Sequence, residues 1–457
     1  MSESRMDAGE LFAAICERIP DAMSRHKVPG VALGITCEGR DFARGFGVTS
    51  INHPLPVDES TLFQIGSTTK TFTATALMRL VEAGKLDLDA PLRTYMPAFR
   101  MKDPDVTARV TTRHLLNHSG GWEGDWFEDT GDGDDALAKY VGLMSKLPQL
   151  SPLGSVLSYN NSAFSLAGRL IEVLTGKTYE TALKELVLSP LGLKRSLLLP
   201  TQVMLHGFAV GHATVADKTI VLRPWQLTRA SRAAGGIAAS ILDQLRYARF
   251  HLGGGTAEDG ARVLSPQTIA AMQSPGEIGE LDYKMGLGWR IQSIGGIARV
   301  FHGGGTWGQI SGFVMAPERK FGLALMTNSN TGGLVARDAT KELLPKFLGY
   351  EDPEPVELPM AAAQMAEYAG RYDQLLGDVE LKVEDGKLMF HVSPKGGFPN
   401  RDIRPGPPPP PFRAGLVAPD RIAMVEPAMK DIQGEFLRSP DGKIAFLRWG
   451  GRIHVRQ

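Results

Sequence analysis

A serine and a lysine three residues apart, Ser67 and Lys70, stand where a segment with helical periodicity begins. Apolar residues recur at three- and four-residue spacing from Phe72 to Val81, and Gly84 offers a stop. One helical turn would bring the serine hydroxyl and the lysine amine onto the same face. Because a serine hydroxyl needs an adjacent base to become a nucleophile, the pair predicts an activated serine.

The alternative is that Ser67 only caps the helix and that Lys70 is solvated on its first turn. A positive charge is unfavourable at a helix N-terminus, so Lys70 is an odd choice for a surface position there. A buried amine, held neutral for chemistry, is the hypothesis that follows.

Composition excludes several classes of function. The 457 residues carry a formal net charge of zero, so no basic excess indicates a nucleic-acid partner. No stretch approaches the roughly 20 apolar residues of a membrane span. The segment 1–25 is charged and lacks the apolar core of a signal peptide, which favours a cytoplasmic protein with no membrane partner. Two cysteines form neither a disulfide framework nor a metal-site spacing.

Element patterns indicate an α+β domain at residues 1–350. Strand patterns lie at both ends of this region, and the stretch 63–252 between them is mostly helical. The expected strands are 31–35, 42–48, 286–291, 299–302, 312–315 and 321–326, and the expected terminal helices are 11–24 and 335–348.

Residues 351–359 have the composition of a linker, and residues 360–457 are rich in strand patterns. Asp385-Gly386 and Gly450-Gly451 are hairpin signals between alternating runs. This part therefore predicts a small antiparallel β-barrel domain. A proline run, 407–411, lies inside it and is expected to be a stiff loop rather than a ligand for a proline-binding module.

Two further motifs follow Ser67-x-x-Lys70 along the chain: Tyr159-Asn160-Asn161, and His302-Gly303-Gly304 at the end of an expected strand. The order and spacing of the three motifs over about residues 10–350 resemble the serine β-lactamase and penicillin-binding-protein superfamily, and class C β-lactamases and their peptidase and esterase relatives most of all. The resemblance implies an antiparallel sheet flanked by helices, a helical subdomain, and an acyl-enzyme mechanism without a cofactor or metal. Supporting strings are 112–121, 233–237 and 285–289.

The resemblance also implies a role for each motif residue. Ser67 would attack a carbonyl, and Lys70 would accept its proton once burial has lowered the amine pKa. Tyr159 would pass the proton to the leaving group, with its phenolate favoured by Lys70. Asn161 would hold Lys70 and the substrate amide. The backbone N–H groups of Ser67 and Gly305 would form the oxyanion hole.

The third motif departs from the family pattern. β-Lactamases and transpeptidases usually carry Lys-Thr-Gly there, whereas this chain has His302 followed by Gly303 and Gly304. A histidine is largely neutral at its ordinary pKa, so the anchoring of a lactam carboxylate is in doubt. His-x-Gly variants are similar to D-aminopeptidases, D-amino-acid-specific peptidases and family VIII esterases. The predicted barrel also resembles the peptidase branch, in which lipocalin-like domains shape the cleft or the oligomer.

These features predict a hydrolase of amide or peptide bonds in a small molecule or short peptide, and they allow for a homo-oligomer. The alternatives are a carboxylesterase and a penicillin- or peptide-binding protein of slow turnover. Two substrate hints are weaker. Tryptophans beside the motif loops (Trp122, Trp126 and Trp307) are expected to line an apolar pocket. An acidic stretch (Glu123, Asp125, Glu128, Asp129, Asp132, Asp134 and Asp135) would be a solvated loop or, less favoured, a rim for a substrate ammonium.

Other chemistries fit poorly. No Gly-x-Ser-x-Gly nucleophile elbow is present. His114 and His118 are four apart on an expected helix, but Leu115 occupies the place of the glutamate in a zinc motif, so capping or packing is the favoured role. Gly253–Gly255 is not followed by the lysine of a phosphate-binding loop.

Overall fold

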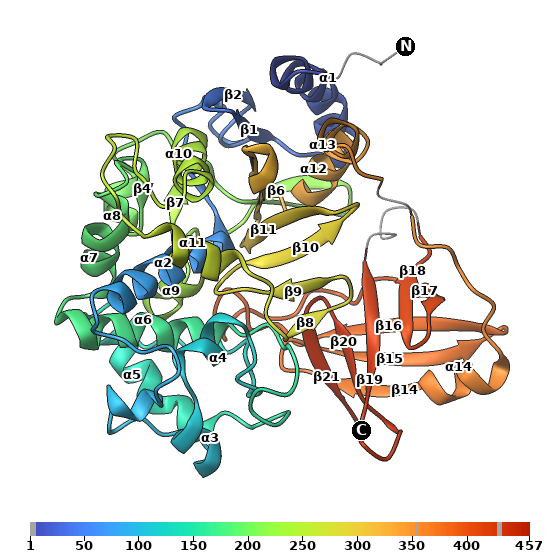
Figure 1. Cartoon of the computed structure of the whole chain (residues 1–457). Coiled ribbons are helices and arrows are strands. Elements are labelled where there is room, and N and C mark those ends of the chain that lie inside the picture. Colours follow the sequence, from blue (N-terminus) through green and yellow to red (C-terminus); the bar gives the residue numbers. More distant parts are fainter. Residues whose placement is uncertain (1–5, 352–353, 427–431) are drawn as a thin grey trace.

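An eight-stranded antiparallel sheet runs through the larger part of the molecule in this computed structural model, which describes residues 6–351, 354–426 and 432–457 (Figure 1). Its strand order is β2-β1-β13-β12-β11-β10-β9-β8. The strands are β1 (Gly30–Cys37), β2 (Arg40–Gly47), β8 (Gly279–Glu280), β9 (Tyr283–Met285), β10 (Arg290–Ile294), β11 (Ile297–Thr306), β12 (Gln309–Ala316) and β13 (Phe321–Thr327).

Chain segments far apart in sequence meet in the middle of this sheet. Strand β1 pairs with β13 so that Val31 lies opposite Thr327, and every residue of β1 is buried. This burial explains why β1 is a continuous small and apolar run instead of an alternating one. The third motif lies on β11 of this sheet, whereas the first two lie at the starts of helices.

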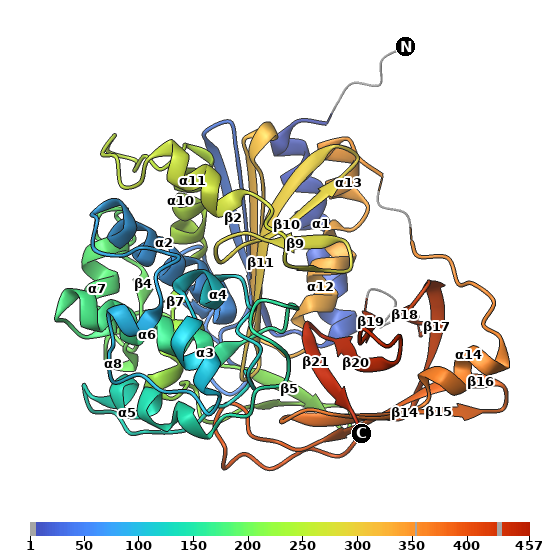
Figure 2. The same cartoon turned by 60° about the horizontal axis from the view of Figure 1, so that its bottom comes forward.

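Helices α1 (Ala8–His26), α12 (Gly332–Thr340) and α13 (Leu343–Leu348) cover one face (Figure 2). The expected single helix 335–348 is wrong in one respect, because the helix is interrupted between α12 and α13. Pro345 has no backbone N–H, so a continuous helix would lose the bond to Lys341.

A helical subdomain lies on the other face of the sheet (Figure 2). Its helices are α2 (Thr69–Glu82), α3 (Pro104–Arg109), α4 (Thr112–Leu116), α5 (Ala136–Leu143), α6 (Asn161–Thr175), α7 (Tyr179–Leu183), α8 (Pro200–Val203), α9 (Arg232–Gly235), α10 (Ile241–Leu252) and α11 (Pro266–Gln273).

Sequence patterns missed five short strands in this subdomain. They form a three-stranded sheet and a hairpin, and each has only two to four residues, too few to show a period. The expected strand 286–291 is also wrong at its start, because Gly286–Trp289 is a turn and β10 begins at Arg290. The short strands are β3 (Phe63–Gln64), β4 (Ser196–Leu197), β5 (His212–Val215), β6 (Lys218–Val221) and β7 (Ala238–Ala239).

The C-terminal part is a closed eight-stranded antiparallel barrel, as the hairpin signals predicted. Helix α14 (Ala362–Tyr368) precedes it, and β14 closes it by pairing Tyr372 with Arg456 of β21. The proline run 407–411 lies in the exposed connection between β16 and β17. The strands are β14 (Gly370–Asp373), β15 (Gly377–Glu384), β16 (Lys387–Pro394), β17 (Phe412–Ala418), β18 (Arg421–Met424), β19 (Gln433–Arg438), β20 (Ile444–Trp449) and β21 (Arg452–Arg456).

The expected linker 351–359 falls partly outside the described residues, at 352–353. Its second half pairs with the barrel, since Leu358 donates its backbone N–H to the Leu416 carbonyl at 2.7 Å. The domain limits 1–350 and 360–457 therefore stay a prediction. No helix in the described ranges combines the length and apolar character that a membrane crossing requires.

The barrel contacts the larger part through its β20–β21 hairpin. Gly451 at the hairpin turn accepts the backbone N–H of Tyr159 at 2.7 Å. Arg448 of β20 donates to the Leu157 carbonyl at 3.0 Å, and the Ile453 backbone donates to Ser158 Oγ at 3.3 Å. The hairpin thus lies directly against the second sequence motif.

Candidate active site

Ser67 and Lys70 lie side by side at the start of α2, as the helical spacing predicted. Ser67 is in a short 3-10 turn, Gly66–Thr68, that leads into the helix. The Lys70 Nζ lies 3.1 Å from Ser67 Oγ. It also donates to Asn161 Oδ1 at 2.6 Å and to the Ala234 carbonyl at 2.7 Å. The lysine is fully buried, so a solvated role is excluded.

Burial lowers the pKa of the Lys70 amine well below its usual value. The charges of Arg452 and Arg290 lower that pKa further, while Asp125 raises it. A neutral amine has two N–H groups, and Asn161 and Ala234 accept both of them. In that neutral form the lone pair would face the Ser67 hydroxyl, 3.1 Å away, as a general base requires.

Tyr159 is buried beside the same pair. Its ring centroid lies 4.8 Å from Lys70 Nζ, and its side chain hydrogen-bonds with Ser67. Burial raises the pKa of the Tyr159 phenol, while Arg290, the Ser67 hydrogen bond and Arg452 each lower it. The positive charges that lower the Tyr159 pKa most belong to these two arginines, and the expected effect of Lys70 on the phenolate stays a prediction.

The glycine run of the third motif packs against the serine turn. A Cβ on Gly304 would lie 1.8 Å from the Ile65 carbonyl oxygen, so the backbones are too close for any side chain. Gly66 has φ +50°, and a Cβ there would lie 2.6 Å from Gly305 N. The two backbone segments expected to form the oxyanion hole are therefore adjacent.

His302 on β11 faces inward, behind this junction. It is 2% exposed, and its Nδ1 lies 2.6 Å from the Gly303 carbonyl, which makes Nδ1 the protonated nitrogen. Burial lowers the pKa of the imidazole well below its usual value, with help from Arg290 and Lys70. His302 is not among the residues that line the cleft over Ser67, and its expected contact with a substrate stays a prediction.

A cleft of about 410 Å³ opens over Ser67. Apolar side chains from both parts of the chain line it, together with three charged ones that come from a loop, the sheet and the barrel. The lining residues are Ser67, Asp125, Phe127, Tyr159, Asn161, Leu227, Ser231, Ala234, Gly235, Arg290, Gly303, Gly304, Gly305, Thr306, Leu376, Phe398 and Arg452.

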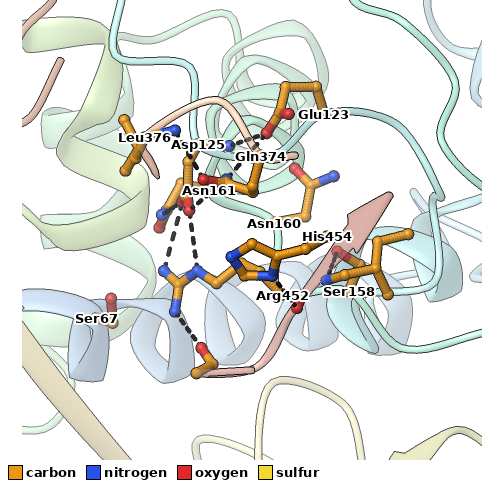
Figure 3. Close-up of polar contacts among 12 residues, drawn as sticks. Ser67, Glu123, Asp125, Ser158, Asn160, Asn161, Gln374, Leu376, Arg452 and His454 are labelled. Carbon is orange, nitrogen blue, oxygen red and sulfur yellow. Dashed lines mark hydrogen bonds and ion pairs between the residues drawn. The ribbon is translucent and has the colours of Figure 1, made fainter. Parts of the chain in front are cut away.

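Sequence reasoning missed Arg452 and Arg290. Arg452 extends from the β20–β21 hairpin, with its Nε 2.9 Å from Asp125 Oδ2 (Figure 3). Its guanidinium lies 4.5 Å from the centroid of the Tyr159 ring, and that of Arg290 lies 5.5 Å from it. The hairpin glycines Gly450-Gly451 were the available signal, but nothing local indicates that this turn enters the cleft.

The two weaker substrate hints are corrected by the structure. None of the three tryptophans lines the cleft; Trp122, for example, is buried and donates its Nε1 hydrogen to Ser162 Oγ at 2.9 Å. Glu123 and Asp125 are buried rather than solvated, and Asp125 is occupied by Arg452. Of the remaining acidic residues Glu128 is half-buried, and the exposed ones are Asp129, Asp132, Asp134 and Asp135.

The histidine pair does not share a helix face. Helix α4 contains His114, which bonds to Thr111 at the helix start, whereas His118 lies beyond the helix with φ +59°. The His118 Nδ1 accepts the Asn160 backbone N–H at 3.1 Å. Within the described ranges, no group of three or more His, Cys, Asp or Glu side chains is placed to hold a metal ion.

The beta-lactamase family model matches residues 15–345. The chain belongs to this family. Penicillin-binding protein 4 of Amycolatopsis lactamdurans is 33% identical over 368 residues, which cover 78% of this chain and 96% of that protein. Esterase EstB of Burkholderia gladioli is 26% identical over 363 residues, or 71% of this chain and 92% of the esterase. These matches confirm the resemblance read from the three motifs.

Solved structures extend the likeness to the barrel. The crystal structure of SurE superposes with a TM-score of 0.75 at 26% identity, covering 98% of this chain and 99% of SurE. SurE has also been crystallised with D-Leu, and that structure gives a TM-score of 0.73. The larger part of the chain is thus a beta-lactamase-family hydrolase fold, and the barrel belongs to the shared architecture.

The close approach at Gly304 gives a testable prediction. In Gly304→Ala the new methyl group would force the β11 backbone away from Ile65, and with it Gly305 away from the serine turn. We expect the free energy of unfolding to fall by about 1–3 kcal/mol. We also expect kcat/KM to fall by about 10²-fold or more, the usual result of losing one oxyanion donor. Denaturant titration and steady-state kinetics measure the two effects.

The matched control is Gly312→Ala on the neighbouring strand β12. A Cβ on Gly312 would have open space around it. We expect this variant to stay within about 0.5 kcal/mol of the parent and to keep its activity. Equal behaviour of the two variants would contradict the packing argument.

Proposed function

We propose that the protein hydrolyses amide or peptide bonds through an acyl-enzyme on Ser67. The Ser67 oxygen would bond to the substrate carbonyl carbon as its proton moves to Lys70 Nζ. The backbone N–H groups of Ser67 and Gly305 would stabilise the resulting oxyanion. Tyr159 would deliver a proton to the leaving amine, and water would then release the acyl group by the reverse proton path.

One observation carries this proposal. The buried Lys70 amine lies 3.1 Å from Ser67 Oγ, and both of its other hydrogen-bond partners are acceptors. A charged ammonium in this position would be costly without a direct carboxylate partner. The arrangement therefore supports a neutral base paired with the serine, which is the property that acyl transfer needs.

The cleft lining supports a substrate with an apolar acyl part. Phe127, Leu227 and Phe398 give the cleft an apolar wall. Two arginines and one carboxylate also line it, so the net charge of the lining is positive. A rim that binds a substrate ammonium is not supported, because Asp125 is already paired. A free amino terminus is thus a poor anchor, and a neutral or acidic peptide is the better candidate.

The second candidate is ester hydrolysis. The apolar lining would also suit an alkyl or aryl ester, and the similarity to an esterase favours it. The third candidate is a protein that is acylated and then stalls, which the similarity to a penicillin-binding protein favours. All three candidates use the same nucleophile. The rate of deacylation separates the stalling protein from the two hydrolases, and turnover of amide against ester substrates separates the hydrolases.

A hydrolysis panel tests the proposal. It compares p-nitrophenyl esters, D- and L-amino-acid p-nitroanilides with free and acylated amino groups, and nitrocefin. We expect turnover of acylated amide substrates and weak nitrocefin hydrolysis, because no lysine stands at the third motif. A burst of one equivalent without turnover would favour the stalling protein, and turnover of esters alone would favour the esterase.

Peptide mapping after rapid quenching locates the adduct. We expect the acyl mass on the peptide that contains Ser67. An adduct on another residue would overturn the mechanism, and so would turnover with no trapped adduct at any pH. Strong nitrocefin turnover would overturn the interpretation of His302.

A further inference from the structure

A chain of polar contacts joins the barrel to the lysine. Arg452 Nε lies 2.9 Å from Asp125 Oδ2, and Asn161 Nδ2 donates to Asp125 Oδ1 at 2.6 Å (Figure 3). The other end of the Asn161 amide, Oδ1, accepts from Lys70 Nζ at 2.6 Å. Four side chains from four separate segments therefore form one connected path to Ser67.

The orientation of the Asn161 amide depends on Asp125. A carboxylate only accepts hydrogen bonds, so it holds the NH₂ end of the amide toward itself. The carbonyl end must then face Lys70, where it accepts an N–H of the amine. If the Asn161 amide were flipped, its N–H groups would face the Lys70 amine. The lone pair of that amine would then no longer point toward Ser67.

Asp125 in turn depends on the barrel. Its side chain is 2% exposed, and a buried carboxylate is costly unless it is paired. Arg452 supplies the pairing charge, and Gln374, which follows β14, lies 3.5 Å from both Asp125 and Glu123. Without Arg452 the uncompensated carboxylate would favour a proton on the neighbouring amine.

We propose that Arg452 and Asp125 are positioning residues for Lys70: the barrel arginine neutralises the carboxylate, and the carboxylate orients Asn161, so that the amine is ready to accept the serine proton. This inference rests on the proposed function. It assigns the barrel a part in acid–base chemistry in addition to covering the cleft. The two residues are expected to act in opposite electrostatic senses on the same amine.

Other ionisable groups also face this cluster, and they come from every element packed around it. Burial raises the pKa of Glu123 beside Asp125, and burial lowers the pKa of His118 and of His302 well below their usual values. In all three groups burial therefore disfavours the charged form. Among the described residues, the groups that act on Lys70 or on its charged neighbours include Glu123, Asp125, His118, Tyr159, Glu280, Arg290, His302 and Arg452.

The test is the pH dependence of Ser67 acylation, measured with a p-nitrophenyl ester from about pH 4 to about pH 10. The rate rises as Lys70 loses its proton. Arg452→Met removes a charge that lowers the pKa of Lys70. The rising limb of the pH–rate profile should therefore move to higher pH by about one unit. Asp125→Asn removes a charge that raises it, so the limb should move to lower pH.

Three further variants sharpen the test. The double variant Arg452→Met/Asp125→Asn should bring the limb back toward that of the parent. Arg452→Lys keeps the charge and should leave the limb in place even if the rate falls. Arg456→Met, on the same strand, removes an arginine that donates to the Ala369 carbonyl inside the barrel part, and its limb should not move.

Opposite shifts with recovery in the double variant would support the proposal. Shifts in the same direction would overturn it, and so would a lower rate with an unmoved limb, since a purely structural role gives that result. If Arg452→Met does not fold, Asp125→Asn and Arg452→Lys still decide the question. Failure of the parent itself to acylate Ser67 would overturn the proposed function, which is a different result from unmoved limbs in a protein that is acylated.

Discussion

Replacing Ser67 by alanine is expected to remove hydrolysis of every substrate that the protein turns over, with kcat/KM falling by at least about 10⁴-fold. The reason is that Ser67 Oγ lies 3.1 Å from Lys70 Nζ, and no other hydroxyl hydrogen-bonds to that amine in the described structure. The covalent acyl mass should disappear together with the activity. Steady-state kinetics and intact-protein mass spectrometry measure the two losses on the same sample.

The control is Ser155→Ala. Ser155 is exposed in a loop near the second motif, and its hydroxyl bonds only to the Pro152 carbonyl. Its activity should match that of the parent. Residual turnover in Ser67→Ala above about a tenth of the parent rate would mean that another group attacks the substrate, and the proposed mechanism would then be discarded.

Replacing Lys70 by methionine is expected to lower kcat/KM by about 10²–10⁴-fold, the usual range for losing a general base. The Ser67 hydroxyl would keep its place but lose its proton acceptor. The fold should survive, because methionine fills a similar volume and the buried amine is replaced by an apolar group. The free energy of unfolding should fall by about 1–3 kcal/mol, because the Asn161 and Ala234 oxygens would each lose a hydrogen-bond donor.

Lys85→Met serves as the comparison, because Lys85 is exposed just after α2. Its kinetics and its free energy of unfolding should both stay near those of the parent. A Lys70→Met protein that keeps its native circular dichroism and full activity would show that the amine is not the base. Loss of activity with unfolding would call instead for Lys70→Arg, which keeps a charge but cannot act as a neutral base.

Local patterns were enough to predict that Ser67 and Lys70 lie side by side. The three-residue spacing of Ser67 and Lys70 is a property of one helical turn, and the structure retains it. The apolar run of β1 and the hairpin glycines of the barrel are likewise local signals. Burial of Lys70 followed from the cost of a charge at a helix start, which can also be argued from a single segment.

The charged part of the site could not be predicted in the same way. Arg452 and Asp125 are separated by 327 residues, and each has an ordinary neighbourhood in the sequence. Asp125 stands at the edge of an exposed acidic loop, so the composition of that loop predicted that Asp125 would be exposed to solvent. The cost of burying Asp125 is offset only when the barrel hairpin docks, through the hydrogen bond between the Gly451 carbonyl and Tyr159.

Aromatic residues were misjudged for a similar reason. Trp122 is next to the motif loops in sequence, but its ring is 1% exposed and its N–H finds a partner in Ser162. The aromatic wall of the cleft instead includes Phe398, which comes from the barrel. Proximity along the chain indicated the right region of the molecule and the wrong side chains.

The contact between the β20–β21 hairpin and Tyr159 also has a consequence for how the protein is made. A ribosome adding about 5–20 residues per second needs roughly 15–65 s to travel the 327 residues from Asp125 to Arg452. Ser67, Lys70 and the sheet strands up to β13 are all made before Gly451 and Arg452, which complete the surroundings of Tyr159 and Asp125. We therefore expect the order of synthesis to let the larger part fold first and to complete the site only when the barrel hairpin has docked.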